Sequence, residues 1–345
     1  MPSTLNIFCC YARADGELLD KLTTHLMPLQ RLGLITIWHD KDIGAGREWE
    51  EEINKRLNTA QIILLLISPD FMASEYCYSK EMHRAMQRHE QNEVSVIPII
   101  LRPTYWKGAP FEKLQMLPDS ARAVTIWPNE DEALYNVTER ISNVVNDLII
   151  KTTLSEAKAL YDDQNYEGAL IIYEQLLKRE ADLAPAYLGK GKSLLALERY
   201  GEGLEAYEEV FRLDPKLADV YFYMEKAEIL YLLKRYEESL SACNEVIQCD
   251  PLLVQGYVGK ADVLLLLDRY REAFEMYEQA IRLKPDEAEY YVQAGDLLLK
   301  LRRFEQSIEM YEQAIQLKPG KDEYYDRKGD VLLGLKRFEE ALAAL

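Results

Sequence analysis

The chain has 345 residues, a hydrophobic fraction of 48% and a formal net charge of −18. This length allows two or more domains, and the hydrophobic fraction is that of globular proteins. The acidic balance, without clusters of basic residues, argues against nucleic acids and anionic membrane surfaces as partners. No apolar run reaches the roughly 18 residues of a membrane span, and the N-terminus lacks a signal core, so we expect a cytoplasmic protein.

The cysteines and histidines show no metal-binding pattern. The five cysteines are odd in number and have no C-x-x-C spacing, which favours buried thiols over disulfides or a zinc site. None of the four histidines forms the i, i+4 pair of a helical metal site. We therefore expect no metal.

Residues 1–149 alternate apolar, β-rich runs with amphipathic helical stretches. The apolar runs are LNIFCCY, LITIWH, QIILLLIS, VSVIPIIL and AVTIW. Continuous apolar strands joined by helical crossovers predict a parallel sheet covered on both faces. Five strands in about 150 residues favour an α/β, flavodoxin-like, doubly wound domain with the strand order 2-1-3-4-5.

In such a sheet, ligands bind beyond the carboxyl ends of the strands, at the switch point flanked by strands 1 and 3. The residues that follow strands 1, 2 and 3 include Tyr11, Arg13, Asp40, Ser68, Tyr76, Cys77 and Glu81. The fold geometry brings four of them toward one cleft: Tyr11, Arg13, Asp40 and Glu81.

Three segments of this half carry a family resemblance. IFCCYARAD resembles the first box of the Toll/interleukin-1 receptor (TIR) domain, and IWHDKDIGAGREWEEEI is similar to the second box with its BB loop. SPDFMASEYCYSKEM resembles the segment that holds the glutamate of NAD-cleaving TIR domains. The resemblance spans about residues 4–149 in the right order, and bacterial TIR proteins are the most similar in style.

The resemblance implies an NAD+ glycohydrolase or cyclase that takes NAD+ as substrate and needs no cofactor. Glu81 would be the catalytic carboxylate beside the ribose. Tyr11 and Arg13 would hold the nucleotide, Asp40 would orient a ribose, and Tyr76 would pack on nicotinamide or ribose. Ser68 and Cys77 complete the expected substrate-binding set.

Structural alternatives remain for these residues. Glu81 could be an ordinary charge on a solvated helix face, and Arg13 or Asp40 could form a structural ion pair or a cap. Many NADase TIR domains place a tryptophan four residues before the glutamate, where this chain has Cys77. On an α-helix Cys77 would lie over Glu81, and Tyr76 would lie to one side.

The loop after the second strand is expected to serve assembly. The residues of this BB loop are Asp42, Ile43, Gly44, Gly46 and Trp49. Ile43 and Trp49 would anchor it to the core, and the glycines would serve its backbone conformation. The resemblance implies self-association through the TIR domain, in which the BB loop completes a neighbour's pocket.

From residue 150 the chain repeats itself, as the 34-residue spacing of Pro251, Pro285 and Pro319 illustrates. Aromatic, small and proline positions recur in each period, and together they resemble the tetratricopeptide repeat (TPR). We expect an all-α solenoid over 150–345, with full repeats starting near residues 150, 184, 220, 254 and 288 and a partial sixth from 322. Because a solenoid needs a polar cap at its end, we expect the array to continue beyond residue 345.

The ninth position of the later repeats carries a row of acids on the face that usually lines the TPR groove: Glu228, Asp262, Asp296 and Asp330. Such a row favours a basic protein or peptide as the partner. The alternative is that similar repeats copied a solvated residue.

Two functions follow from this reading. The first is a TIR NADase that is activated by oligomerisation, with the TPR array as sensor or scaffold in bacterial defence or stress signalling. The second is a non-catalytic TIR–TPR adaptor. The product of the first function would be linear or cyclic ADP-ribose.

Overall fold

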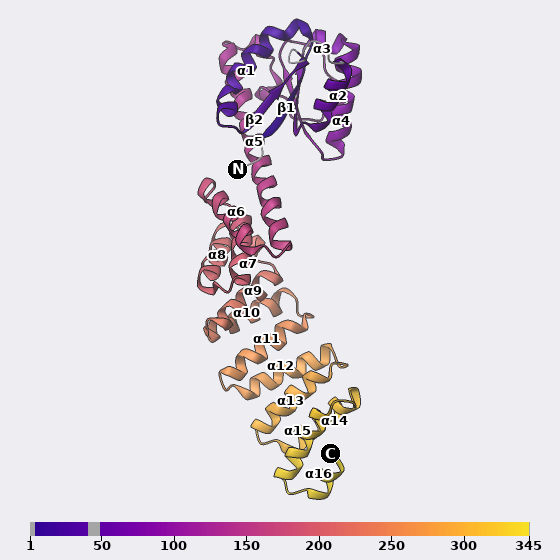
Figure 1. The fold of residues 1–345 in the computed structure, drawn as a ribbon, viewed down its shortest axis with the longest axis vertical. Coiled ribbons are helices and arrows are strands. Elements are labelled where there is room, and N and C mark those ends of the chain that lie inside the picture. Colours follow the sequence, from indigo (N-terminus) through magenta and orange to yellow (C-terminus); the bar gives the residue numbers. More distant parts are fainter. Residues whose placement is uncertain (1–3, 41–48, 345) are drawn as a thin grey trace. The chain divides into compact units, whose positions relative to one another are not determined.

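The computed structural model describes residues 4–40 and 49–344, and the chain divides into two compact units, Met1–Thr153 and Leu154–Leu345. Figure 1 shows strands only in the first unit and stacked helices in the second. Each unit has hydrophobic clusters of its own.

The first unit is built on a four-stranded parallel sheet of order β2-β1-β3-β4. The strands are β1 (Leu5–Cys10), β2 (Ile35–Trp38), β3 (Ile62–Ile67) and β4 (Ser95–Ile100). All six residues of β3 are buried, because helices cover both faces of the sheet. The α/β class and the order of the first four strands are confirmed.

The two faces of the sheet pack against different helices (Figure 1). One face contacts α1 (Gly16–Arg31) and α5 (Glu130–Asp162). The other contacts α2 (Trp49–Thr59), α3 (Pro69–Ala73), the π-helix η3 (Glu75–Met82) and α4 (His83–Glu90). Alternation along β1 explains this division: Ile7 and Cys9 face the first group, while Phe8 and Cys10 face the second.

The predicted fifth strand, AVTIW at residues 123–127, is wrong. Val124–Ile126 form a 3₁₀ helix, η5, in which the Thr125 N–H donates to the Leu101 carbonyl at 3.1 Å. The free edge of β4 instead holds Leu117, which bonds with Pro98 and Ile100 at 2.9 and 2.8 Å. The next N–H that could donate to this edge is that of Asp119, and it donates instead to Oδ1 of Asn136 at 3.0 Å, so this pairing stays a single bridge.

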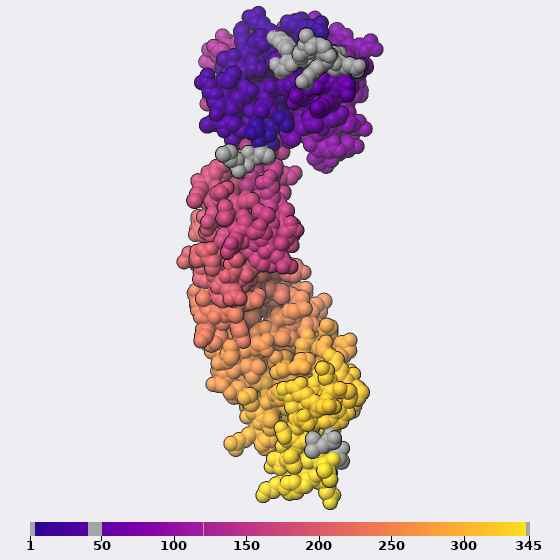
Figure 2. Space-filling model, viewed as in Figure 1, coloured from indigo at the N-terminus to yellow at the C-terminus, as the bar shows by residue number. Residues whose placement is uncertain are grey.

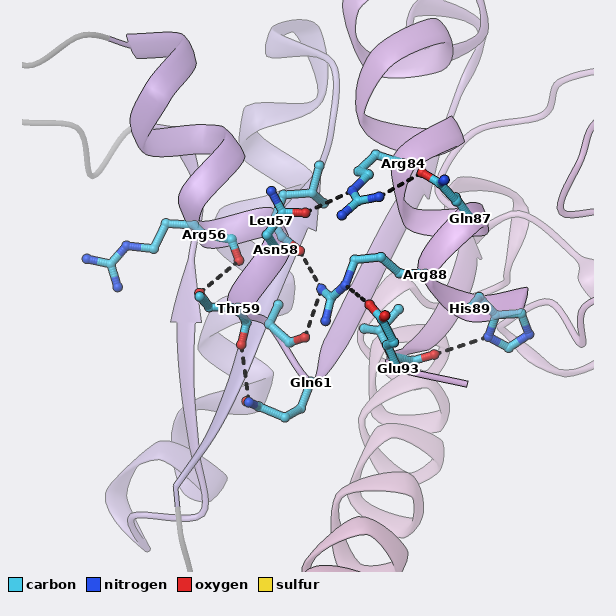
Figure 3. Close-up of polar contacts among 12 residues, drawn as sticks. Arg56, Leu57, Asn58, Thr59, Gln61, Arg84, Gln87, Arg88, His89 and Glu93 are labelled. Atoms are coloured by element: carbon cyan, nitrogen blue, oxygen red, sulfur yellow. Dashed lines mark hydrogen bonds and ion pairs between the residues drawn. The ribbon is translucent and has the colours of Figure 1, made fainter. Parts of the chain in front are cut away.

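Arg88 on α4 secures the C-terminal end of α2 (Figure 3). It is a buried charged residue, and its Nη1 donates to the carbonyls of Leu57 and Ala60 at 2.6 and 3.1 Å. Its Nε also donates to Glu93 at 3.2 Å. The last carbonyls of a helix have no partner within the helix, so the guanidinium satisfies groups that would otherwise be buried without hydrogen bonds.

The second unit is a stack of antiparallel helix pairs, each packed on the next (Figure 1). The colours of its surface follow the chain order from magenta to yellow (Figure 2). Its helices after α5 are α6 (Tyr166–Arg179), α7 (Ala184–Ala196), α8 (Tyr200–Leu213), α9 (Val220–Leu232), α10 (Tyr236–Cys249), α11 (Val254–Leu266), α12 (Tyr270–Leu283), α13 (Ala288–Lys300), α14 (Phe304–Leu317), α15 (Asp322–Gly334) and α16 (Phe338–Ala344). The two extra residues that follow the second repeat lie beside the 3₁₀ helix η6 (Pro215–Leu217).

Small residues set the spacing within each pair. A Cβ at Gly191 would lie 2.6 Å from the ring of Tyr207, and a Cβ at Gly295 would lie 2.7 Å from the ring of Tyr311. Both tyrosines are almost fully buried. The glycines are therefore required for close packing of the aromatic rings, as the recurring small positions predict.

We predict that Arg88→Ala lowers the free energy of unfolding by roughly 2–4 kcal/mol, since it leaves two helix-end carbonyls unsatisfied. Chemical denaturation monitored by circular dichroism measures this change. Arg84→Ala is the matched control, because Arg84 is only partly buried and its hydrogen bonds in Figure 3 go to other side chains of α2 and α4. Its cost should stay below about 1 kcal/mol; equal costs would contradict the role given to Arg88.

Gly295→Ala should lower the melting temperature, because the added methyl overlaps the buried Tyr311 ring and costs about 1–3 kcal/mol. Gly259→Ala is the comparison, also within a TPR helix, where a Cβ meets nothing nearer than the Cys243 sulfur at 3.8 Å. That change should raise the melting temperature through helix propensity, by up to about 1 kcal/mol. Thermal unfolding of both variants tests the difference in sign.

Candidate active site

A cavity of about 420 Å³ lies where the carboxyl ends of β1, β2 and β3 meet the π-helix η3. It is the position that the switch-point rule predicts for a ligand. The cavity brings together six of the seven residues expected from the sequence: Tyr11, Arg13, Asp40, Tyr76, Cys77 and Glu81.

Glu81 is buried, with 7% of its surface exposed, so it is not a charge on a solvated helix face. It lies on η3, a π-helix in place of the predicted α-helix. A π-helix bonds residues five apart, so Tyr76 comes closer to the face of Glu81 than α-helical geometry allows. Tyr76 and Cys77 therefore both line the cavity with Glu81.

Burial raises the pKa of Glu81 to about 8, from an ordinary value of 4.5. The nearby carboxylate of Asp40 raises the pKa further, whereas a hydrogen bond with the Cys10 thiol opposes the rise. A buried carboxyl with a pKa near neutrality is typical of catalytic sites.

Tyr11 and Asp40 are joined across the cavity wall. The Tyr11 hydroxyl donates to Oδ1 of Asp40, and burial together with this bond raises the pKa of the Tyr11 hydroxyl. The Cys77 thiol donates to the carbonyl of Tyr11 at 3.3 Å, and the Cys77 N–H donates to the Ser74 hydroxyl at 3.2 Å. These contacts fix the end of β1 against the start of η3.

Ser68 does not line the cavity, in contrast to its predicted role. Its hydroxyl is fully buried, caps α3 by accepting from the Phe71 N–H at 3.0 Å, and donates to Asp15 at 2.5 Å. The helix that follows β3 thus uses this serine as an N-cap.

Two carboxylates near this serine, those of Asp15 and Asp70, were not among the expected site residues. Asp15 is buried and also accepts from Nε of Arg102 at 2.7 Å, and Arg102 pairs with Asp70, which lines the cavity. Asp70 and Arg102 both follow closely on the carboxyl end of a strand, and this position was the signal that could have identified them.

The predicted BB-loop residues Asp42, Ile43, Gly44 and Gly46 lie outside the described residues. Trp49 is the first residue of α2, and its side chain also lies outside what the structure describes.

Within the described residues, no group of histidine, cysteine, aspartate and glutamate side chains could hold a metal ion. No helix among these residues is long and apolar enough to span a membrane.

The predicted groove carboxylates differ in their surroundings. Asp262 and Asp296 accept hydrogen bonds from Tyr277 and Tyr311 at 2.8 and 2.6 Å, and Asp296 also forms an ion pair with Arg327. Glu228 and Asp330 are exposed. The row is therefore not a uniform acidic surface, since one of its members is already neutralised.

The raised pKa of Glu81 predicts a pH-dependent stability. Between pH 4.5 and about 8 the folded protein retains a proton on Glu81 that the unfolded chain has lost. The contribution of this protonated carboxyl to the free energy of unfolding is therefore complete below about pH 4.5 and is lost as the pH rises to about 8. Each unit of difference between the folded and unfolded pKa of Glu81 changes the free energy of unfolding by about 1.4 kcal/mol, so the full shift amounts to several kcal/mol.

Glu81→Gln should therefore gain stability relative to the unmodified protein as the pH rises from about 6 to about 9. Thermal melts across this range measure the gain, with Glu75→Gln, an exposed position on the same π-helix, as the control. Parallel pH profiles for Glu81→Gln and the unmodified protein would show that Glu81 ionises normally. The other groups around Glu81, namely Asp40, Cys10, Cys77 and Tyr76, are present in all three proteins.

Comparison with known families agrees with this division of the chain. A family model described as TIR domain matches residues 7–133. A model described as tetratricopeptide repeat matches residues 154–216, 188–253, 258–322 and 292–345, which is more than half of the chain.

Among curated proteins, the uncharacterized protein y4lF of Sinorhizobium fredii (strain NBRC 101917 / NGR234) is 48% identical over 141 residues. These residues make up 41% of this chain and 43% of that protein, so the match spans less than half of either.

The solved structures that are similar to the chain include one of a TPR repeat-containing protein and one of MamA. The C-terminal part of a TPR repeat-containing protein from Cytophaga hutchinsonii has 14% identity and a TM-score of 0.50, covering 53% of this chain and 72% of that one. MamA from Desulfovibrio magneticus RS-1 has 17% identity and a TM-score of 0.46, covering 50% and 97%. The chain belongs to the tetratricopeptide repeat family and carries a TIR domain ahead of its repeats.

Proposed function

We propose that the TIR domain is an NAD+ glycohydrolase or cyclase, with Glu81 as its catalytic carboxylate. One observation carries the proposal: a buried glutamate with a raised pKa lines a cavity at the switch point of the sheet, together with Asp40, Tyr11 and Tyr76. TIR domains of the NAD-cleaving kind, which the sequence resembles, use a glutamate of this segment.

The reaction breaks the bond between the ribose C1′ and the nicotinamide nitrogen, and the electron pair of that bond leaves with nicotinamide as a neutral ring. The sugar then carries positive charge, as in glycoside hydrolysis, and a carboxylate beside it lowers the barrier. Water or a nucleophile within the adenine nucleotide takes the place of nicotinamide at C1′.

The substrate itself would ionise Glu81. NAD+ brings a cationic pyridinium ring toward a carboxyl whose pKa is about 8, and a neighbouring positive charge favours the charged form. Glu81 would thus release its proton as the substrate binds and be an anion when positive charge develops on the ribose.

The surrounding residues have separate roles in this proposal. Asp40, held by the Tyr11 hydroxyl, would accept from a ribose hydroxyl, and the exposed Arg13 would bind a phosphate. The ring of Tyr76 would form the aromatic wall of the nicotinamide site in place of a tryptophan. Lys80 contacts the same ring, with its ammonium 5.4 Å from the ring centroid.

We further propose that self-association of the TIR domain activates the enzyme and that the TPR array binds a protein partner as sensor or scaffold. Bacterial defence or stress signalling is the proposed setting. The presence of TIR and TPR domains supports a role in signalling through protein contacts. The cavity around Glu81 supports the proposed cleavage of NAD+.

The second candidate is a non-catalytic adaptor, in which the TIR domain pairs with other TIR domains and the repeats recruit a client. Cys77 favours it, because a small thiol stands where many NADase domains have a tryptophan to stack on the ligand. Binding of NAD+ separates the two candidates, since an adaptor needs no nucleotide.

We predict that the oligomerised protein releases nicotinamide from NAD+ and that Glu81→Gln lowers the rate at least about 100-fold. The substitution keeps the size of the side chain and removes only its charge. Oligomers made by fusion to a tetrameric coiled coil, assayed by chromatography of nicotinamide, provide the measurement.

Glu75→Gln is the matched control, because Glu75 is an exposed glutamate on the same π-helix and should leave the rate unchanged. If the oligomerised protein is inert and NAD+ causes no shift in its melting temperature, the adaptor function replaces the enzyme.

A further inference from the structure

The TPR array contains a repeated contact between consecutive repeats. Position nine of one repeat faces position six of the next, and two such places hold an ion pair. Lys192 pairs with Glu225 at 3.2 Å, and Asp296 pairs with Arg327. A charge at position nine is therefore neutralised by the following repeat at these two places.

The two places between them lack the compensating charge. By repeat position, the partner of Glu228 would be Gly259, which has no side chain, and the partner of Asp262 would be the neutral Gln293. Among the described residues, no lysine, arginine or histidine forms an ion pair with Glu228 or Asp262.

Asp262 and Asp296 otherwise have matching surroundings. Each accepts from the tyrosine fifteen residues later, at 2.8 and 2.6 Å. Gln293 donates to Glu289 at 2.8 Å, as Arg327 donates to Glu323 at 2.8 Å in the next repeat. The repeats thus differ by the guanidinium, which is present at Asp296 and absent at Asp262.

A cavity of about 550 Å³ opens at the unpaired place, between α9 and α11. Glu228 and Asp262 line it, and Gly259 leaves space where the corresponding residue of another repeat has a side chain. Tyr221, Met224 and Tyr231 form apolar and aromatic walls, and Tyr221 is 64% exposed. Burial without a cation raises the pKa of Asp262.

We propose that this cavity, which we call the Glu228 cavity, binds an arginine side chain of a partner polypeptide. Two carboxylates without a cationic partner attract the guanidinium charge, and tyrosine faces suit its flat shape. Arg327 on Asp296 is the internal example of the same contact. The volume exceeds that of a guanidinium group, and its aromatic walls accommodate the residues beside the arginine.

The test titrates the full chain with acetyl-Leu-Arg-Leu-amide and with the same tripeptide carrying citrulline, a neutral isostere of arginine. Nuclear magnetic resonance of the backbone amides reports the site and the affinity. We expect saturable shifts on α9 and α11, binding at least about tenfold weaker for citrulline, and weakening by added salt.

Gly259→Arg should abolish binding, because it supplies the guanidinium from within the chain as Arg327 does at Asp296. Glu228→Gln removes the charge at constant size and should weaken binding about tenfold. Asp296→Asn is the matched control, since the same repeat position is already ion-paired there and binding should be unchanged.

Equal binding of the citrulline tripeptide, or full binding by Glu228→Gln, would overturn the proposal. Free arginine amide that binds as tightly as the tripeptide would overturn the assignment to a polypeptide and indicate a small-molecule site instead.

Discussion

The burial of one carboxyl group, that of Glu81, sets the electrostatics of the cavity in the TIR domain. Glu81 lies against Asp40 and Cys10 at the carboxyl ends of the central strands, where desolvation raises its pKa to about 8. Such burial opposes folding at high pH, and a purely structural helix would avoid it by placing a neutral residue there. In the proposed reaction, this destabilising burial keeps the carboxyl away from water until the cationic NAD+ binds.

In the repeats, carboxylates and cations of neighbouring repeats compensate each other's charge at some positions and not at others. Ion pairs between consecutive repeats occur at Lys192 and at Asp296, where the chain provides both partners. At Glu228 and Asp262 it provides only the carboxylates, and a cavity opens beside Gly259. A repeat array makes such a gap visible because each repeat serves as the reference for the next.

Much of the fold followed from local patterns in the sequence. Apolar runs predict β1 to β4, and the strand order of the doubly wound fold places Tyr11, Asp40 and Glu81 at one edge of the sheet. The prediction of a strand at AVTIW was wrong because an apolar, β-branched segment can also form a buried 3₁₀ helix, as Val124–Ile126 do. The pairing of Leu117 with β4, which excludes a fifth strand there, depends on contacts that no local pattern encodes.

The sequence by itself determined the period of the repeats, the strands and the switch point, because these depend on the spacing of apolar and small residues. The tertiary structure decided three further matters. It formed η3 as a π-helix, which brought Tyr76 toward the face of Glu81, and it used Ser68 as a buried cap. It also paired Asp296 but not Glu228, since an ion pair requires residues from neighbouring repeats to meet in space.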